Sequence, residues 1–199
     1  MNPRPKSERD VSKPPVEVFD YDPRWPKMFD REKALIMSAV GDKAIGIEHI
    51  GSTAVSGLGA KPIIDIMVGV HCLTDAKRCI RPLERIDYEY VPEYEDSMPE
   101  RRYFRKGPNE PNKHYHLHMV EYDGEFWKRD LFFRDYLRKH PKTASEYFRL
   151  KRQLAVKYRL NREGYTEAKT SFVRSIVSKA NSEKQQACLR LRKSIPLKK

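Results

Sequence analysis

The stretch that decides the fold is His49–Val68, HIGSTAVSGLGAKPIIDIMV. It joins a loop of small residues to an apolar, strand-like run that carries one acid, Asp65. Gly51 permits backbone conformations that other residues avoid, and Ser52 and Thr53 offer hydroxyl and main-chain N–H groups to phosphate oxygens. Neither the P-loop spacing nor GxGxxG is present, so the loop alone is more typical of a turn between two strands.

The spacing between loop and acid resembles that of polymerase-β-like nucleotidyltransferases, in which a Gly-Ser pair holds the triphosphate and acids on the next strand hold metal. Gly51, Ser52 and Asp65 match this arrangement. The second acid would lie two residues on, on the same face of the strand, where this chain has Met67. Two bridging carboxylates normally hold a metal pair about 3.5 to 4 Å apart, so Met67 argues against ordinary two-metal transfer.

The flanking sequence predicts a mixed α/β (α+β) domain. Phe29, Lys33, Ile36 and Val40 recur at helical spacing before a stop signal at Gly41. We predict strands over 44–50, 62–70, 88–92, 101–106 and 114–122, a helix over 74–86, and a C-terminal group of three helices over 125–140, 143–160 and 165–180. The expected fold is a mixed sheet of nucleotidyltransferase type with flanking helices.

The run HYHLHMV suggests a ligand set for the lone acid. His114, His116 and His118 alternate along a predicted strand and therefore project from one face. If this strand lies beside the Asp65 strand, Asp65, His116 and His118 form a mixed N/O set that suits Mn, Zn, Fe or Ni better than Mg. Glu48 and His49, just before the loop, are candidates for a further metal ligand or a general base.

The same run also satisfies the histidine-triad pattern, in which the central histidine attacks an α-phosphate. In that alternative, His116 is the nucleophile of nucleotidyl transfer or hydrolysis. The helical segment that follows is unlike the usual end of those small proteins, which ranks this hypothesis second.

Basic residues are abundant, and most are expected on solvated faces. Lys169 stands apart, because it lies four residues after Tyr165 and three before Phe172, at the edge of an apolar helical stripe. Arg134 lies in the aromatic run FFRDYL, where Asp135 or a ligand would hold it. The cations that we would test near a phosphate are Lys61, Arg102, Arg105, Lys106, Arg134 and Lys169.

Net charge, cysteine spacing and the length of apolar runs limit the classes of partner that the chain is expected to bind. Of the formal net charge of +12, residues 1–15 carry +2 and residues 181–199 carry +5, which leaves +5 for residues 16–180. That value suits a binder of phosphate-bearing small molecules, and a nucleic-acid partner working through the basic tail is the less favoured alternative. Three cysteines without CxxC spacing, no signal-peptide pattern and no run of membrane-spanning length indicate a cytoplasmic protein without a membrane partner. We expect a loose leader over 1–15, one domain over 16–180 and a basic tail over 181–199.

The chain resembles the GrpB family of nucleotidyltransferase-fold proteins, which also occur as the C-terminal part of some dephospho-coenzyme A kinases. The resemblance rests on YDPRWPKMF, IEHIGSTAVSGLGAKPIIDIMV, HLHMVE, FRDYLRKHP and YTEAKTSFV, in that order. It implies a nucleotidyltransferase-type core and a pocket where these residues meet: Gly51, Ser52, Lys61, Asp65, His116, His118 and Lys169. The lack of an acid at Met67 fits the family.

Together these patterns predict a metal-dependent, nucleotidyltransferase-like enzyme. Asp65, His116 and His118 are the catalytic candidates and, with Glu48, the ligands of a divalent ion, Mg, Mn or Zn. The candidates for binding a nucleotide or another phosphate-bearing small molecule are Gly51, Ser52, Thr53, Lys61, Arg105, Arg134 and Lys169. The alternative from another class is a non-catalytic module that binds nucleotide or serves a coenzyme A enzyme.

Overall fold

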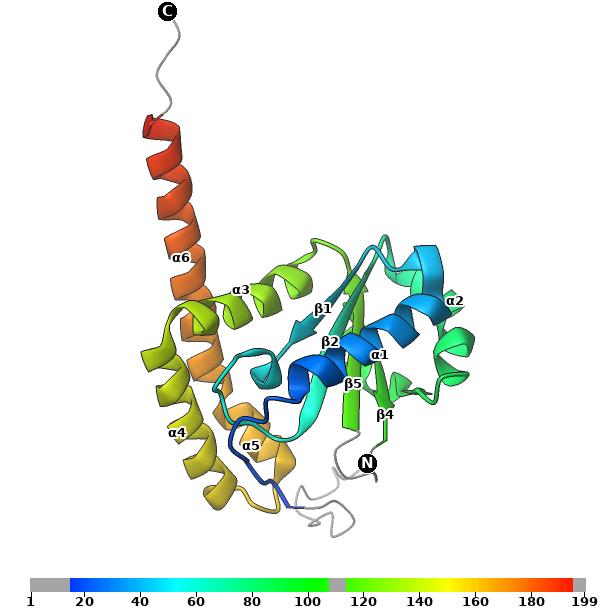
Figure 1. Cartoon of the computed structure of the whole chain (residues 1–199), viewed down its shortest axis with the longest axis horizontal. Coiled ribbons are helices and arrows are strands. Elements are labelled where there is room, and N and C mark those ends of the chain that lie inside the picture. Colours follow the sequence, from blue (N-terminus) through cyan, green and yellow to red (C-terminus); the bar gives the residue numbers. More distant parts are fainter. Residues whose placement is uncertain (1–14, 108–113, 195–199) are drawn as a thin grey trace, which may run out of the picture.

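The apolar run around Asp65 forms the centre of a five-stranded sheet. A computed structural model describes residues 15–107 and 114–194 and gives the strand order β1-β2-β5-β4-β3 (Figure 1). The strands are β1 (Gly46–Ile50), β2 (Ile63–Val70), β3 (Glu89–Tyr90), β4 (Arg101–Lys106) and β5 (His114–Glu121). Only β2 and β5 pair in parallel; the other neighbours are antiparallel. The predicted α/β class with a mixed sheet is therefore confirmed.

The two faces of β2 have different neighbours, because successive side chains point to opposite sides of a strand. Ile64, Ile66 and Val68 belong to the core that packs under α1 (Trp25–Val40) and α2 (Leu73–Glu84). On the other face, Met67 packs with Phe126 and Trp127 of α3 (Glu125–Lys139). Every residue of β2 except Asp65 is buried, so the strand offers one polar side chain on the α3 face.

Helix α1 differs from its expected stripe at one position. Phe29, Ile36 and Val40 are buried as expected, whereas Lys33 is exposed and Glu32 is buried in its place. The Glu32 carboxylate accepts a hydrogen bond from Lys106 Nζ at 2.9 Å. A partner on a distant strand lets a charge occupy the apolar stripe, which helical spacing alone does not reveal.

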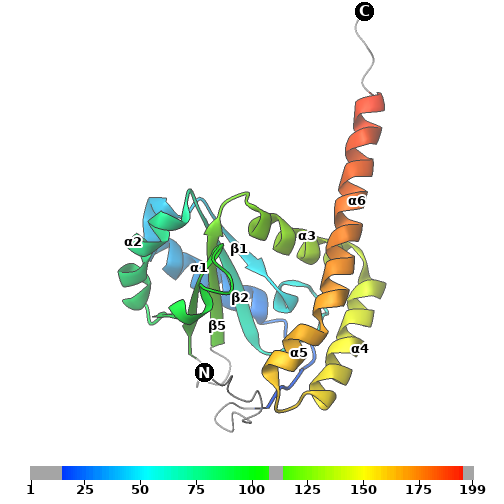
Figure 2. The same cartoon turned by 180° about the vertical axis from the view of Figure 1, so that it is seen from behind.

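Between residues 125 and 194, the described part of the C-terminal segment holds four helices where the sequence predicted three. They are α3, α4 (Pro141–Lys157), α5 (Arg162–Ala168) and α6 (Thr170–Ser194). The predicted helix over 165–180 is interrupted at Lys169, whose amide donates to Thr166 O in a tighter turn than an α-helix. Helix α6 also continues past residue 180 into the predicted tail and projects beyond the body of the protein (Figure 2).

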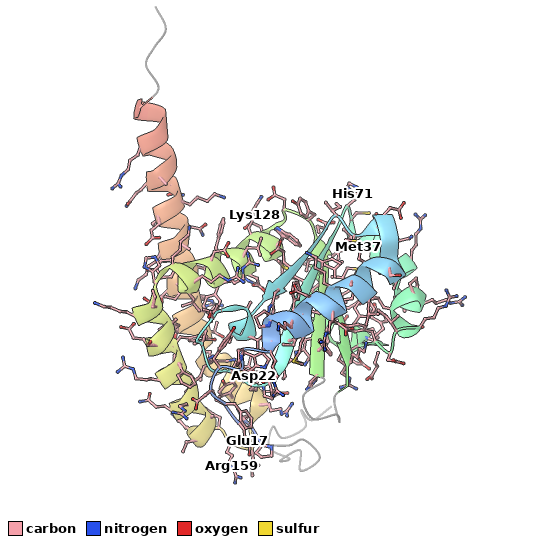
Figure 3. All side chains as sticks on the ribbon, in the orientation of Figure 1. Glu17, Asp22, Met37, His71, Lys128 and Arg159 are labelled. Atoms are coloured by element: carbon pink, nitrogen blue, oxygen red, sulfur yellow. The ribbon has the colours of Figure 1, made fainter. Side chains whose placement is uncertain are left out.

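The first described residues pack against the segment that follows α4. The predicted leader lies outside the described residues except for Pro15, and Val16 N–H donates to Arg159 O at 2.8 Å after α4. Figure 3 labels Glu17 and Arg159 at this contact. Among the helices of residues 15–107 and 114–194, none has both the length and the hydropathy to cross a bilayer.

Candidate functional site

Asp65, His116 and His118 lie together on the α3 face of the sheet. The parallel register sets Asp65 beside His116 and Met67 beside His118. Asp65 Oδ1 lies 3.3 Å from His116 Nδ1 and 3.9 Å from His118 Nε2. One donor atom from each of the three residues lies within 4.8 Å of the other two. We call these three residues the Asp–His group; the parallel pairing of β2 and β5 is what assembles it.

The electrostatics of the Asp–His group favour an ionised Asp65 carboxylate beside a neutral His118 imidazole. Burial alone would raise the pKa of Asp65, but hydrogen bonds with His116 and His118 hold it well below its usual range. Burial lowers the pKa of His118, and the charge of Asp65 only partly opposes this shift. An ionised carboxylate and neutral imidazoles are the protonation states in which these side chains can ligate a metal.

Not every imidazole of the run joins this group. His114 makes an edge-to-face contact with His116, with ring centroids 4.8 Å apart, but it is not among the three clustered donors. Burial and then the neighbouring His116 lower the pKa of His114 to about 4. This imidazole is therefore neutral near pH 7 and contributes an aromatic edge to the face.

The Gly-Ser loop packs directly against Asp65. Gly51 adopts φ +70°, and a Cβ at this position would lie 2.5 Å from Asp65 Oδ2. Any larger residue would therefore be strained and would displace the carboxylate. Ser52 opens a short 3₁₀ helix, Ser52–Ala54, immediately after this close approach.

Thr53 belongs to the same loop but has structural partners. It is buried, its hydroxyl donates to Ile63 O at 3.2 Å, and its Oγ1 lies 3.0 Å from His49 Nε2. Because Ile63 O receives the hydroxyl hydrogen, Thr53 Oγ1 is left as an acceptor for His49. The Thr53 hydroxyl thus ties the loop to β1 and to the start of β2.

Lys151 on α4 contacts the loop, and sequence reasoning missed it. This side chain is only 3% exposed. Its Nζ donates to Ser52 Oγ at 2.9 Å and to Gly59 O, and it lies 4.8 Å from the centre of the Tyr147 ring. Lys151 lies four residues after Tyr147 on the buried stripe of α4, so the helical-spacing criterion that identified Lys169 could have found it.

Lys61 and Lys169 approach the same region over one aromatic ring. Lys61 Nζ lies 5.5 Å and Lys169 Nζ lies 4.3 Å from the centre of the buried Tyr165 ring. The face of an aromatic ring attracts cations, so Tyr165 can hold both ammonium groups near each other. We call Lys61, Lys151 and Lys169 the lysine cluster.

Burial and repulsion by neighbouring cations lower the pKa values of the lysine cluster. Burial, then Lys169 and Lys61, lower the pKa of Lys151 to about 7. Burial, then Lys61, lower the pKa of Lys169 to about 8, and burial also lowers the pKa of Lys61. The charge of Asp65 opposes each of these shifts. Clustered ammonium groups with depressed pKa values are the expected environment for an anionic ligand.

Glu48 and Arg134 are paired with each other. Arg134 Nη1 donates to Glu48 Oε2 at 2.6 Å and to His49 O at 3.0 Å, while its Nε donates to Asp135 Oδ1 at 2.7 Å. Glu48 lies across from Met67 and not from Asp65, and it is not part of the Asp–His group. The structure thus places the predicted ligand Glu48 in a contact between β1 and α3.

The remaining predicted cations also point to other partners. Arg105 makes two hydrogen bonds to Glu89, at 2.6 and 2.7 Å. Arg102 lies 3.3 Å from Glu95, and Lys106 pairs with Glu32. These three contacts lie toward β3 and α1, so the structure does not bring these cations to the Ser52 loop.

The Asp–His group lies beside a hollow of about 510 Å³ between α3 and α6. Phe126 lines this hollow and also stacks over His118 with ring centroids 6.2 Å apart. Asp65, His116 and His118 line neither this hollow nor the two others described. The chemistry of the side chains, rather than the shape of a cavity, therefore identifies the candidate site.

We expect Arg134→Met to lower stability without changing ligand affinity. Arg134 is 9% exposed, but Glu48 and Asp135 are about 40% exposed and regain water, so the expected loss in free energy of unfolding is about 1 to 3 kcal/mol. Urea denaturation measures this loss. Lys139→Met is the control, because Lys139 is an exposed cation on the same helix and its removal should cost less. Unchanged stability with weakened nucleotide binding would instead place Arg134 in the ligand site.

Comparisons with known proteins agree with the fold. A family model described as GrpB protein matches residues 15–179. The chain is 36% identical to glutamate-rich protein GrpB of Alkalihalophilus pseudofirmus, covering 84% of this chain and 97% of that protein. The crystal structure of conserved protein GrpB from Enterococcus faecalis matches with a TM-score of 0.76 at 35% identity, covering 85% of this chain and 99% of that chain. A dephospho-CoA kinase of Mycobacterium bovis is 38% identical over 85 residues, which are 41% of this chain and 21% of the kinase.

Proposed function

Because the chain belongs to the GrpB family, we propose that it is a metal-dependent, nucleotidyltransferase-like enzyme that binds a nucleotide or a related phosphate-bearing small molecule. One observation carries the proposal: Asp65 clusters with the imidazoles of the Asp–His group, and its negative charge also acts on each ammonium group of the lysine cluster. A carboxylate with imidazoles can bind a cation, and clustered lysines can bind an anion. Phosphoryl chemistry needs both beside each other.

The lysine cluster and the Ser52 loop form the anion-binding half of the proposal. Lys151 holds Ser52 Oγ at 2.9 Å, and Lys61 and Lys169 share the Tyr165 ring. A chain of two or three phosphates would contact several ammonium groups at once and neutralise the repulsion among them. The cluster thereby favours di- and triphosphates over monophosphates.

The Asp–His group forms the cation-binding half of the proposal. Donor atoms around one Zn or Mn ion lie about 3 to 3.5 Å apart. The separation of 3.3 Å between Asp65 and His116 matches this spacing, and the separation of 3.9 Å between Asp65 and His118 is longer. Asp65, His116 and His118 would hold the ion, and the N/O donor set suits Mn or Zn better than Mg. When bound, the ion would polarise an α-phosphate as a Lewis acid.

A second candidate is a non-catalytic module that serves a coenzyme A or nucleotide enzyme. The match to part of a dephospho-CoA kinase favours it, because that match covers 41% of this chain. A module would bind its ligand tightly without turnover, and removal of metal would leave the affinity unchanged. Turnover that depends on metal would favour the enzyme.

Isothermal titration calorimetry tests the proposal. Nucleoside triphosphates, diphosphates and monophosphates are titrated into the full chain with Mn²⁺, Zn²⁺, Mg²⁺ or a chelator. We expect triphosphates to bind most tightly and Mn²⁺ or Zn²⁺ to increase their affinity. The proposal fails if no nucleotide binds in any combination.

We also expect triphosphate affinity to fall as the pH rises from about 7 to 9. The pKa of Lys151 is about 7 and that of Lys169 about 8, so both ammonium groups lose protons over this range. The ligand binds the protonated form, and its terminal phosphate is already largely ionised at pH 7. Binding at about pH 8 should therefore take up protons, which calorimetry in buffers of different ionisation enthalpy measures. Affinity that stays constant over this range would contradict the assignment of these lysines.

A further inference from the structure

Arg101 on β4 contacts the Nδ1 side of the His118 ring, whereas Asp65 lies on the Nε2 side. Its Nη1 lies 3.0 Å from His118 Nδ1, at hydrogen-bonding distance. A guanidinium can only donate hydrogen bonds, so Nδ1 must be the acceptor in this contact. The neutral imidazole then carries its proton on Nε2, the nitrogen that faces Asp65 Oδ1 at 3.9 Å.

This tautomer opposes a metal at the same nitrogen. A metal would need the Nε2 lone pair of His118, which requires the ring proton to move to Nδ1. Two donors, Nδ1–H and the Arg101 N–H, would then face each other at 3.0 Å. Metal-ligating histidines usually donate their second N–H to a carboxylate, a carbonyl or water. Beside His118 Nδ1, the Arg101 guanidinium, which can only donate, lies where such an acceptor would be.

The carboxylates of Glu100 and Asp130 also attract the charge of Arg101, but its contacts favour the position beside His118. Within the part of the chain that the structure describes, its buried Nε has no hydrogen-bond partner. The guanidinium lies 5.0 Å from the centre of the Tyr103 ring, which pairs with His118 across β4 and β5. The Tyr103 ring and the His118 contact therefore keep Arg101 beside the group.

We propose that Arg101 sets the tautomer of His118 and thereby weakens the binding of divalent transition metals to Asp65, His116 and His118. The inference rests on the proposed function, because it concerns the same donor atoms. Arg101 is a positioning residue that acts through His118. A metal ion can be bound by all three residues of the Asp–His group only when Arg101 no longer donates a hydrogen bond to His118 Nδ1.

The test measures metal affinity and the histidine tautomer, and neither readout needs enzyme activity. Co²⁺ is titrated into the nucleotide-free full chain and followed by its visible absorption. Removal of the opposing donor in Arg101→Leu should tighten Co²⁺ binding by about 10- to 100-fold, the range that outer-shell partners of metal sites usually contribute. Arg105→Leu is the matched control, because it removes the same charge from the same face of β4, where Glu89 already holds it. We expect the control to bind Co²⁺ within about twofold of the wild type.

Nitrogen NMR of the metal-free wild type gives a second readout that does not depend on whether Arg101→Leu and Arg105→Leu fold. The His118 signal is identified by its loss in His118→Gln, and we expect a protonated Nε2 and an accepting Nδ1. A proton on Nδ1 would overturn the inference, as would equal Co²⁺ affinity, or none, in Arg101→Leu and Arg105→Leu. Nucleotide binding measured separately shows whether the phosphate half of the proposed function stands when this inference fails.

Discussion

Lys151→Met should lower the affinity for a nucleoside triphosphate by about 10- to 100-fold at pH 7, the value of one charge-assisted hydrogen bond. Lys151 is buried, and its ammonium group holds both Ser52 Oγ and Gly59 O. Its loss would remove a cation from the cluster and free the Ser52 loop. Calorimetric titration of the triphosphate without metal measures the effect.

The control for this variant lies on the same helix. Lys157→Met makes the same chemical change at an exposed position of α4 and should leave the affinity unchanged. We expect the unfolding free energy of Lys151→Met to change by less than about 1 kcal/mol, because removal of a buried charge offsets the lost hydrogen bonds. A large loss of stability with unchanged triphosphate affinity would show that Lys151 serves only to hold the loop.

Asp65→Asn should have effects of opposite sign on the two halves of the site. Metal affinity should fall by more than about 100-fold, because even outer-shell partners contribute about 10- to 100-fold. Triphosphate affinity without metal should rise by about fivefold or more, because one negative charge beside the lysine cluster is removed. Titrations of Mn²⁺ alone and of triphosphate with chelator separate the two effects.

Glu48→Gln is the matched control for Asp65→Asn. Glu48 lies on the same face of the sheet but pairs with Arg134. We therefore expect the metal affinity of Glu48→Gln to stay within about twofold of the wild type. Equal losses in the two variants would instead make Glu48 a ligand. If Asp65→Asn weakened the binding of triphosphate without metal, Asp65 could not lie beside the phosphates as proposed.

Local patterns in the sequence predict part of this site. Alternation along 114–120 placed His116 and His118 on one face, and the strand run placed Asp65. Helical spacing singled out Lys169, and the same criterion applied to α4 would have found Lys151. These residues could be identified because the side-chain periods of strands and helices are fixed.

Other contacts depend on tertiary register, which one sequence does not contain. Glu48 and Arg134 meet across 86 positions, and this pairing holds a predicted metal ligand and a predicted phosphate-binding residue against each other. Arg101 reaches His118 only because β4 pairs with β5 so that Tyr103 lies opposite His118. A shift of one residue in that register would turn Arg101 to the other face of the sheet.

A crystal structure of the full chain with Mn²⁺ and a nucleoside triphosphate analogue that resists cleavage at its α-phosphate tests the account most directly. We predict an anomalous scattering peak bound by Asp65, His116 and His118, with the phosphates on Ser52 and the lysine cluster and Arg101 turned away from His118. A nucleotide bound elsewhere, with no anomalous peak at Asp65 when Mn²⁺ is saturating, would contradict the account.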